Sequence, residues 1–182
     1  YLFRTVLLSV LVLGCSNHQE QKIDKDDFRS DMTESSKLFF RNVRQTYYDV
    51  EEHQPSKSTI FRMSAREKSE EKPVLNVFIR QVVVQDKVFA MVESNTYLAD
   101  LEEFEIHWKD SKTQQEGIYT LPKIANAPLH YAFATEIYSS IQANHSLNIK
   151  TKKGLEPILA DETAREAFRK TMVDFYRLVN LL

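Results

Sequence analysis

A short polar and aromatic stretch from Arg41 to Tyr48 carries side chains well suited to binding a charged ligand. The guanidinium groups of Arg41 and Arg44 lie close in sequence to the amide of Asn42 and the phenol of Tyr48. If the stretch is a β-strand, Asn42, Arg44 and Tyr48 share one face of it. Because guanidinium groups bind carboxylates through paired hydrogen bonds, we expect a ligand such as a peptide or an acidic glycan. The alternative is an exposed sheet face whose arginines pair with surface acids.

Histidines, serines and acids elsewhere lack the spacing of a recognised catalytic or metal site. The histidines are His18, His53, His107, His130 and His145. None has a second histidine, a cysteine or a carboxylate at the spacing of a metal-ligand cluster. The sequence contains no G-x-S-x-G motif, and adjacent acids such as Glu51 and Glu52 are better explained by loops and helix ends. We therefore predict no catalytic residue, no metal site and no cofactor.

Composition excludes two classes of partner and favours a folded chain. The formal net charge is -2 with both signs interspersed, which argues against nucleic acid because that partner favours a clustered basic face. Only three glycines occur, so no glycine-rich loop is present to hold a phosphate or a dinucleotide. The hydrophobic fraction of 42% is neither that of a disordered chain nor that of a membrane-spanning one.

The first residues place a charge before an apolar run. Arg4 precedes an apolar stretch over residues 6–13, which is followed by Gly14 and Cys15. This order is typical of a secretory signal, and the run is shorter than the roughly 20 apolar residues that span a bilayer. The segment resembles the lipobox of bacterial lipoproteins, in which a signal peptidase cuts before a cysteine that carries lipid.

The resemblance implies a processed, membrane-anchored protein. Residues 1–14 would be the signal peptide, and Cys15 would be the lipid attachment site at the mature N-terminus. Two or three acyl chains give stable anchoring where one chain binds only marginally. Ser16 resembles the sorting pattern of lipoproteins sent to the outer membrane of double-membraned bacteria, so the expected location is the cell envelope. The alternatives are an uncleaved N-terminal anchor and a buried apolar segment with a core cysteine.

The rest of the chain divides into a linker and one domain. Residues 15–36 comprise the cysteine and a polar, charged stretch, which we expect to be a flexible tether. Residues 37–182 are long enough for a single globular domain with a substantial core. Aromatic and β-branched residues begin at residue 38, where the pattern over 38–50 fits a helix or a strand and its residue types slightly favour a strand.

Strand patterns dominate the middle of the chain. Residues 74–84 and 87–93 predict a central hairpin around Gln85 and Asp86. Strict alternation predicts that Phe104, Ile106 and Trp108 face the core. The other expected strands cover residues 58–65, 104–109, 118–121, 147–150 and 155–159.

Two helices follow from end signals and apolar stripes. Asn126, with Pro128 in the first turn, opens one helix that ends at Asn144, and Asp161 opens the second. Their expected buried stripes are Leu129, Phe133, Ile137 and Ile141, then Ala164, Phe168, Met172, Phe175 and Val179. Strands followed by helices predict an α+β fold: an antiparallel sheet of about five to seven strands with both helices packed on one face.

Two classes of function fit this sequence. The first is a non-catalytic envelope lipoprotein, tethered to a membrane through lipid on Cys15, that binds another envelope protein, a peptide or a glycan or holds an assembly together. The alternative is a periplasmic or surface-exposed enzyme, such as a hydrolase, whose groups converge only in three dimensions. A third possibility is a curved sheet that encloses a small apolar ligand.

Overall fold

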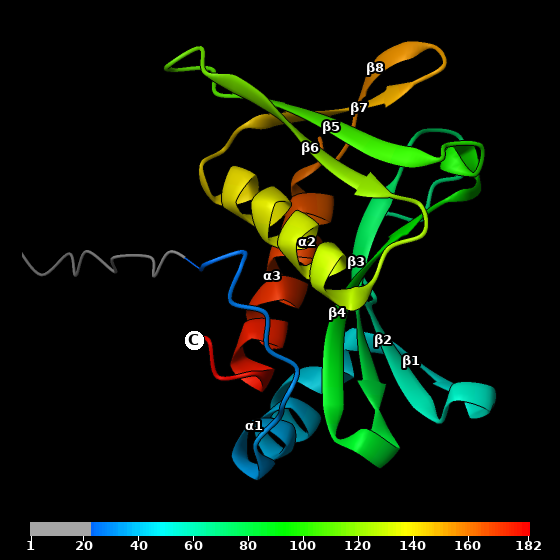
Figure 1. The fold of residues 1–182 in the computed structure, drawn as a ribbon, viewed down its shortest axis with the longest axis vertical. Coiled ribbons are helices and arrows are strands. Elements are labelled where there is room, and N and C mark those ends of the chain that lie inside the picture. Colours follow the sequence, from blue (N-terminus) through cyan, green and yellow to red (C-terminus); the bar gives the residue numbers. More distant parts are fainter. Residues whose placement is uncertain (1–22) are drawn as a thin grey trace, which may run out of the picture.

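A computed structural model describes residues 23–182. Eight strands form two antiparallel sheets, with the orders β1-β2-β3-β4 and β6-β5-β7-β8 (Figure 1). The first sheet contains β1 (Tyr48–His53), β2 (Ser58–Met63), β3 (Leu75–Val82) and β4 (Lys87–Ser94). The second contains β5 (Glu103–Lys109), β6 (Glu116–Pro122), β7 (Ser146–Thr151) and β8 (Gly154–Pro157).

Helices α2 (Ala127–Gln142) and α3 (Glu162–Leu178) pack against each other and against the sheets (Figure 1). Helix α2 contacts β4 and β6, and α3 contacts β2, β3 and β4. Both predicted caps are confirmed, because Asn126 accepts a hydrogen bond from the amide of Leu129 and Asp161 accepts one from that of Thr163. The predicted antiparallel α+β class is confirmed, although the strands number eight and form two sheets.

The predicted hairpin of β3 and β4 is present, but only β3 is a central strand. A 3₁₀ turn, η4 (Val83–Gln85), connects them, and Asp86 has a left-handed φ of 52°. Strand β4 lies at the end of its sheet. Its outer edge is covered by the chain around Ser30, whose carbonyl accepts a hydrogen bond from the amide of Val88 at 2.9 Å.

The segment that covers this edge differs from the flexible tether expected over residues 15–36. Ile23 is buried, and the ring of Phe28 lies 6.4 Å from that of Phe89 and 5.7 Å from that of Tyr131. In Figure 1 the segment descends beside α3 to reach α1. A few apolar side chains in a polar stretch are enough to hold the backbone when a sheet edge offers it hydrogen bonds.

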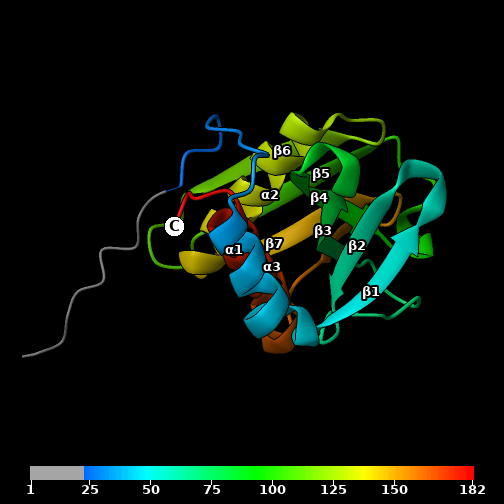
Figure 2. The same cartoon turned by 90° about the horizontal axis from the view of Figure 1, so that it is seen from below.

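Residues 38–47 are helical, so the slight preference for a strand was wrong there. Helix α1 (Glu34–Phe39) continues through a π-helical turn, η1 (Phe40–Arg44), and a 3₁₀ turn, η2 (Gln45–Tyr47). Thr33 and Ser36 form a capping box that starts the helix, which is a local signal stronger than the β propensity of the residues after it. Helix α1 packs beside α3 (Figure 2).

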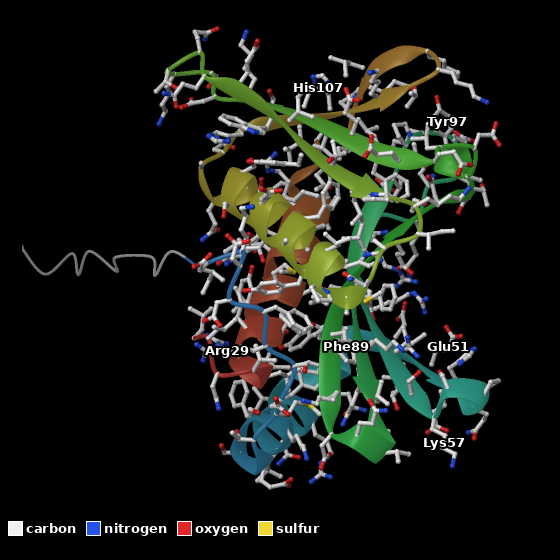
Figure 3. The ribbon with its side chains drawn as sticks, viewed as in Figure 1. Arg29, Glu51, Lys57, Phe89, Tyr97 and His107 are labelled. Carbon is white, nitrogen blue, oxygen red and sulfur yellow. The ribbon has the colours of Figure 1, made fainter. Side chains whose placement is uncertain are left out.

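One cluster of buried residues connects both sheets with the helices. Phe104 and Ile106 of β5 are buried in it as predicted, and Trp108 packs against its margin with its ring stacked 4.7 Å from that of His145. The hairpin of β1 and β2, marked by Glu51 and Lys57, projects away from the helices (Figure 3). No helix among residues 23–182 is both long and apolar enough to cross a membrane.

Candidate ligand-binding groove

A groove of about 470 Å³ lies between the α1–η1 segment and the helix-facing side of the first sheet. We call it the α1 groove. Its floor is apolar: Phe61 of β2, Ile79 of β3 and Val88 of β4 are buried there, and the accessible apolar lining comes from Met32 and Leu38. Its size falls within the range of about 300–1,000 Å³ that is typical of small-molecule sites. The groove is therefore a candidate site by size and by lining.

Phe40 packs the helical wall of the groove, formed by α1, η1 and η2, against the first sheet. Its ring lies 5.4 Å from that of Tyr48 and 5.2 Å from that of Phe61, and it is buried between them. Phe40 begins the π-helical turn, and such turns shift the side chains that follow relative to a regular helix. The wall is thus anchored by Phe40, while Arg41 next to it lies exposed at the groove.

The rim of the groove carries one lysine that is paired with acids and one arginine that has no partner among the described residues. The ammonium of Lys37 lies 2.8 Å from a carboxylate oxygen of Glu34 and 2.8 Å from one of Asp86, which connects α1 to the β3–β4 turn. The hydrogen bonds to Asp86 and then Glu34 raise the pKa of Lys37. Arg41 makes no ion pair or hydrogen bond with any side chain of residues 23–182, so its guanidinium is available to a ligand.

Two half-buried glutamines lie on opposite walls of the groove. Gln45 belongs to η2 on the helical wall, and Gln81 belongs to β3 on the sheet. Neither side-chain amide has a hydrogen-bond partner within the part of the chain that the structure describes. The α1 groove therefore combines an apolar floor with three unpartnered polar groups, counting Arg41.

The four residues singled out in the sequence lie in different surroundings. They do not share a strand face, because residues 40–47 are helical and β1 begins at Tyr48. Only Arg41 lines the α1 groove, and Asn42 is exposed outside it. Arg44 and Tyr48 do come together, but both point to a buried acid on α3.

That acid is Asp174, whose side chain joins three elements. The Nε atom of Arg44 donates to both of its oxygens at 2.8 and 3.0 Å, and the hydroxyl of Tyr48 donates at 2.7 Å. Asp174 is only 2% exposed. Burial raises the pKa of Tyr48, and the negative charge of Asp174 raises it further. The contacts fix the end of the helical wall against α3, which is a positioning role for Arg44 and Tyr48.

Sequence reasoning missed Gln45, Gln81 and Asp174. Asp174 had a signal, because helical spacing from Ala167 through Thr171 to Leu178 puts it on the buried face of α3. An acid at such a position needs a partner from another element. The glutamines had no comparable signal, since their position at one groove depends on how α1 docks onto the sheet.

The described residues offer one partly buried contact between a serine and a histidine. The Oγ atom of Ser140 lies 3.2 Å from Nδ1 of His145 and 2.9 Å from the hydroxyl of Tyr119. Ser140 is 0% exposed and lies near the end of α2, so no solvent-borne substrate reaches its hydroxyl. The contact instead secures the turn after α2 against the second sheet.

Residues 23–182 contain no group of three or more histidine, cysteine or acidic side chains arranged to hold a metal ion. Histidine-to-acid contact does occur on the second sheet, where Nε2 of His107 lies 2.7 Å from Glu105. Lys150 approaches the same carboxylate at 3.1 Å. Cys15 and the 1–14 signal segment lie outside the described residues. No family model, curated protein or solved structure matches this chain.

Proposed function

We propose that this protein is a cell-envelope lipoprotein whose folded part binds a ligand in the α1 groove without transforming it. The observation that carries the proposal is the groove itself, in which unpartnered polar groups lie near the accessible apolar side chains of Met32 and Leu38. Ligand sites commonly have this composition, a mostly apolar lining with a few polar groups that fix orientation. The ligand belongs to another envelope component, such as a protein, a peptide or a glycan.

The proposed anchor is lipid on Cys15, at the outer membrane of a double-membraned bacterium. The order of Arg4, the apolar run and Gly14-Cys15 supports it. Only residues 16–22 separate Cys15 from Ile23, which is buried in the folded body. The eight residue steps from Cys15 to Ile23 span at most about 29 Å, so an anchored body stays close to the lipid headgroups.

Binding is favoured over hydrolysis by the groups in the α1 groove. A hydrolase needs a nucleophile activated by a neighbouring base. The hydroxyl of Ser35, which lines the groove, contacts the hydroxyl of Thr33 at 3.0 Å. No histidine lines the groove, and Lys37 is engaged by two acids. The described residues thus offer ligand contacts in the groove without an activated nucleophile.

A dye titration tests the groove. The probe is 1-anilinonaphthalene-8-sulfonate, an apolar anion whose fluorescence rises in apolar sites, added to the lipid-free protein. Ser35→Trp fills the groove from its exposed rim, and Ser111→Trp places the same ring in the β5–β6 loop as the matched control. We expect saturable binding that is lost in Ser35→Trp and kept in Ser111→Trp. Equal binding by all three proteins contradicts the proposal, as does hydrolysis of an ester substrate that Ser35→Trp abolishes.

The anchor has its own test in the native host. Expressed there, the protein should enter the detergent-rich phase on Triton X-114 partitioning, and Cys15→Ala should move it to the aqueous phase because the lipid acceptor is gone. Ser16→Ala, one residue away, is the control that keeps the thiol. A Cys15→Ala protein that still partitions with detergent would show that the lipid anchor is not what holds it.

A further inference from the structure

We infer that the α1 groove binds the free C-terminus of a peptide whose last residue is apolar. The inference rests on the proposed function, because it names the ligand of the same site. Three features of the groove carry it, and each matches one part of such a ligand: a guanidinium for the terminal carboxylate, two amides for the adjoining peptide group and an apolar floor for the last side chain.

The charge at the rim favours an anion next to Arg41. Lys37 is already balanced by Glu34 and Asp86, whose carboxylates are largely exposed and therefore screened by water and salt. No carboxylate within residues 23–182 comes within 4.0 Å of the Arg41 guanidinium. A planar guanidinium binds a carboxylate through two parallel hydrogen bonds, which makes a ligand carboxylate its natural partner.

The two glutamines favour a peptide ligand over a simple fatty acid. Each side-chain amide of Gln45 and Gln81 has both a donor and an acceptor, the same pair that a peptide group presents. A fatty acid has only its carboxylate and leaves both amides without a partner as it excludes water from the groove. Half-buried polar groups left unpaired weaken binding, so the two walls favour a ligand with amides along its length.

The floor provides for an apolar terminal side chain. Ile79 and Val88 are 0% exposed and Phe61 is packed against Phe40, so the apolar side chains that a ligand can contact in the groove are those of Met32 and Leu38. Burial of an aliphatic or aromatic side chain there contributes in proportion to the apolar area removed from water. An acidic last residue would bring a second charge onto this floor and is therefore disfavoured.

The test uses fluorescence polarisation with synthetic peptides. Three peptides share the sequence Gly-Ser-Gly-Ser-Ala and end in Leu, Phe or Val, each made with a free carboxylate and again as the C-terminal amide. A fourth ends in Asp, and dodecanoate is the hydrocarbon competitor. We expect at least one free acid to bind about tenfold or more tightly than its amide, which is the change that about 1.4 kcal/mol of charge-assisted bonding produces.

Variants assign the effect to the groove. In Arg41→Gln the free-acid and amide peptides should bind with nearly equal affinity. Gln81→Leu should weaken binding of the free-acid peptide several-fold, although the apolar lining of the groove is kept. Lys112→Gln removes an exposed cation in the β5–β6 loop and should change neither affinity. Because Arg41 has no partner within residues 23–182, Arg41→Gln should unfold at the same temperature as the wild type.

The outcomes separate this inference from the proposed function. Three results would overturn the inference that the groove binds a peptide C-terminus: equal affinity for acids and amides, stronger binding of the Asp peptide, or binding of dodecanoate alone. If the dye still binds and Ser35→Trp still abolishes that binding, the groove stands as a ligand site for another class of molecule. If neither the dye nor any peptide binds, both the inference and the proposed function fail.

Discussion

The Nε atom of Arg44 lies 2.8 Å from a carboxylate oxygen of Asp174, although the two residues are 130 positions apart in the chain. This pair joins the helical segment after α1 to the last helix, and Tyr48 adds a third member where β1 begins. Because α3 also packs on β2, β3 and β4, the Arg44–Asp174 pair fixes the position of the α1–η1 segment relative to the first sheet. The shape of the α1 groove therefore depends on a buried acid outside it.

Removal of Asp174 should destabilise the fold strongly. Asp174→Ala leaves the half-buried Arg44 and the buried Tyr48 hydroxyl without their acceptor, for which we expect a loss of about 3 kcal/mol in the free energy of unfolding. Urea denaturation measures it. The triple variant Arg44→Met, Tyr48→Phe and Asp174→Leu should recover most of the loss, because apolar replacement of a buried ionic cluster is often neutral when no polar group is left unpaired. A loss below about 0.5 kcal/mol in Asp174→Ala would mean that the pair is not structural.

His130 should make stability depend on pH. Its Nδ1 atom accepts a hydrogen bond from the amide of Val92 at 3.2 Å, which requires a neutral ring at that nitrogen, and burial lowers its pKa below the ordinary 6.5. As the pH falls below about 6.5, the unfolded chain takes up this proton before the folded one. The free energy of unfolding should therefore decrease from pH 7 towards pH 5.5, until the folded pKa is passed.

The His130 effect is measured as a difference between proteins. Urea unfolding of wild type and His130→Asn should give curves that converge as the pH falls, because asparagine keeps an acceptor and does not titrate. His53→Asn is the control, since the His53 ring is exposed at the end of β1 and has no acid partner among the described residues. Parallel pH profiles for wild type and His130→Asn would show that the histidine is not protonated differently in the two states.

Phe28 should hold the N-terminal segment onto the edge of β4. Phe28→Ala removes the ring contacts with Phe89 and Tyr131, and a half-buried ring should contribute about 1–2 kcal/mol. Hydrogen exchange gives the local result. The Val88 amide, bonded to the carbonyl of Ser30, should exchange faster, while the Val92 amide, bonded to His130, should not. Unchanged exchange at Val88 would show that the segment is held by other contacts.

Gly117 should be intolerant of even one methyl group. A Cβ atom built there meets the indole of Trp108 at 2.6 Å, and Gly117 lies directly opposite Trp108 in the β5–β6 pair. Gly117→Ala should cost about 1–3 kcal/mol and shift the emission of Trp108, the one tryptophan in the chain. Thr120→Ala, exposed on the same strand, is the control. Wild-type emission and stability in Gly117→Ala would show that the ring moves aside freely.

Elements with strong end signals were predictable from the sequence. The Asn126 and Asp161 caps, the β3–β4 hairpin and the alternation in β5 are local patterns, and the structure has all of them. Residues 38–47 were ambiguous because their residue types favour a strand while their spacing also fits a helix. The capping box at Thr33 and the packing of Phe40 decided for the helix.

The candidate site was predictable only in part, for a physical reason. Arg41 was identified from its charge and its neighbours, but whether it pairs with an acid depends on the docking of α1. Arg44 looked equivalent in the sequence and proved to be committed to Asp174, an acid on the last helix. Gln45 and Gln81 line opposite walls of a groove that exists only after α1, β3 and α3 have packed, so no local pattern identifies them.

The central claim is that the α1 groove receives the end of a peptide. Methyl NMR tests it most directly, with isoleucine-labelled protein titrated with the Gly-Ser-Gly-Ser-Ala-Leu peptide, its Phe and Val counterparts and their amides. A free-acid peptide should shift the signal of Ile79, which is buried beneath the groove, in a saturable way, and the matching amide should shift it less. The signal of Ile118 on the second sheet should stay unchanged. Shifts at Ile118 with none at Ile79, or no saturable shift with any peptide, would contradict the account.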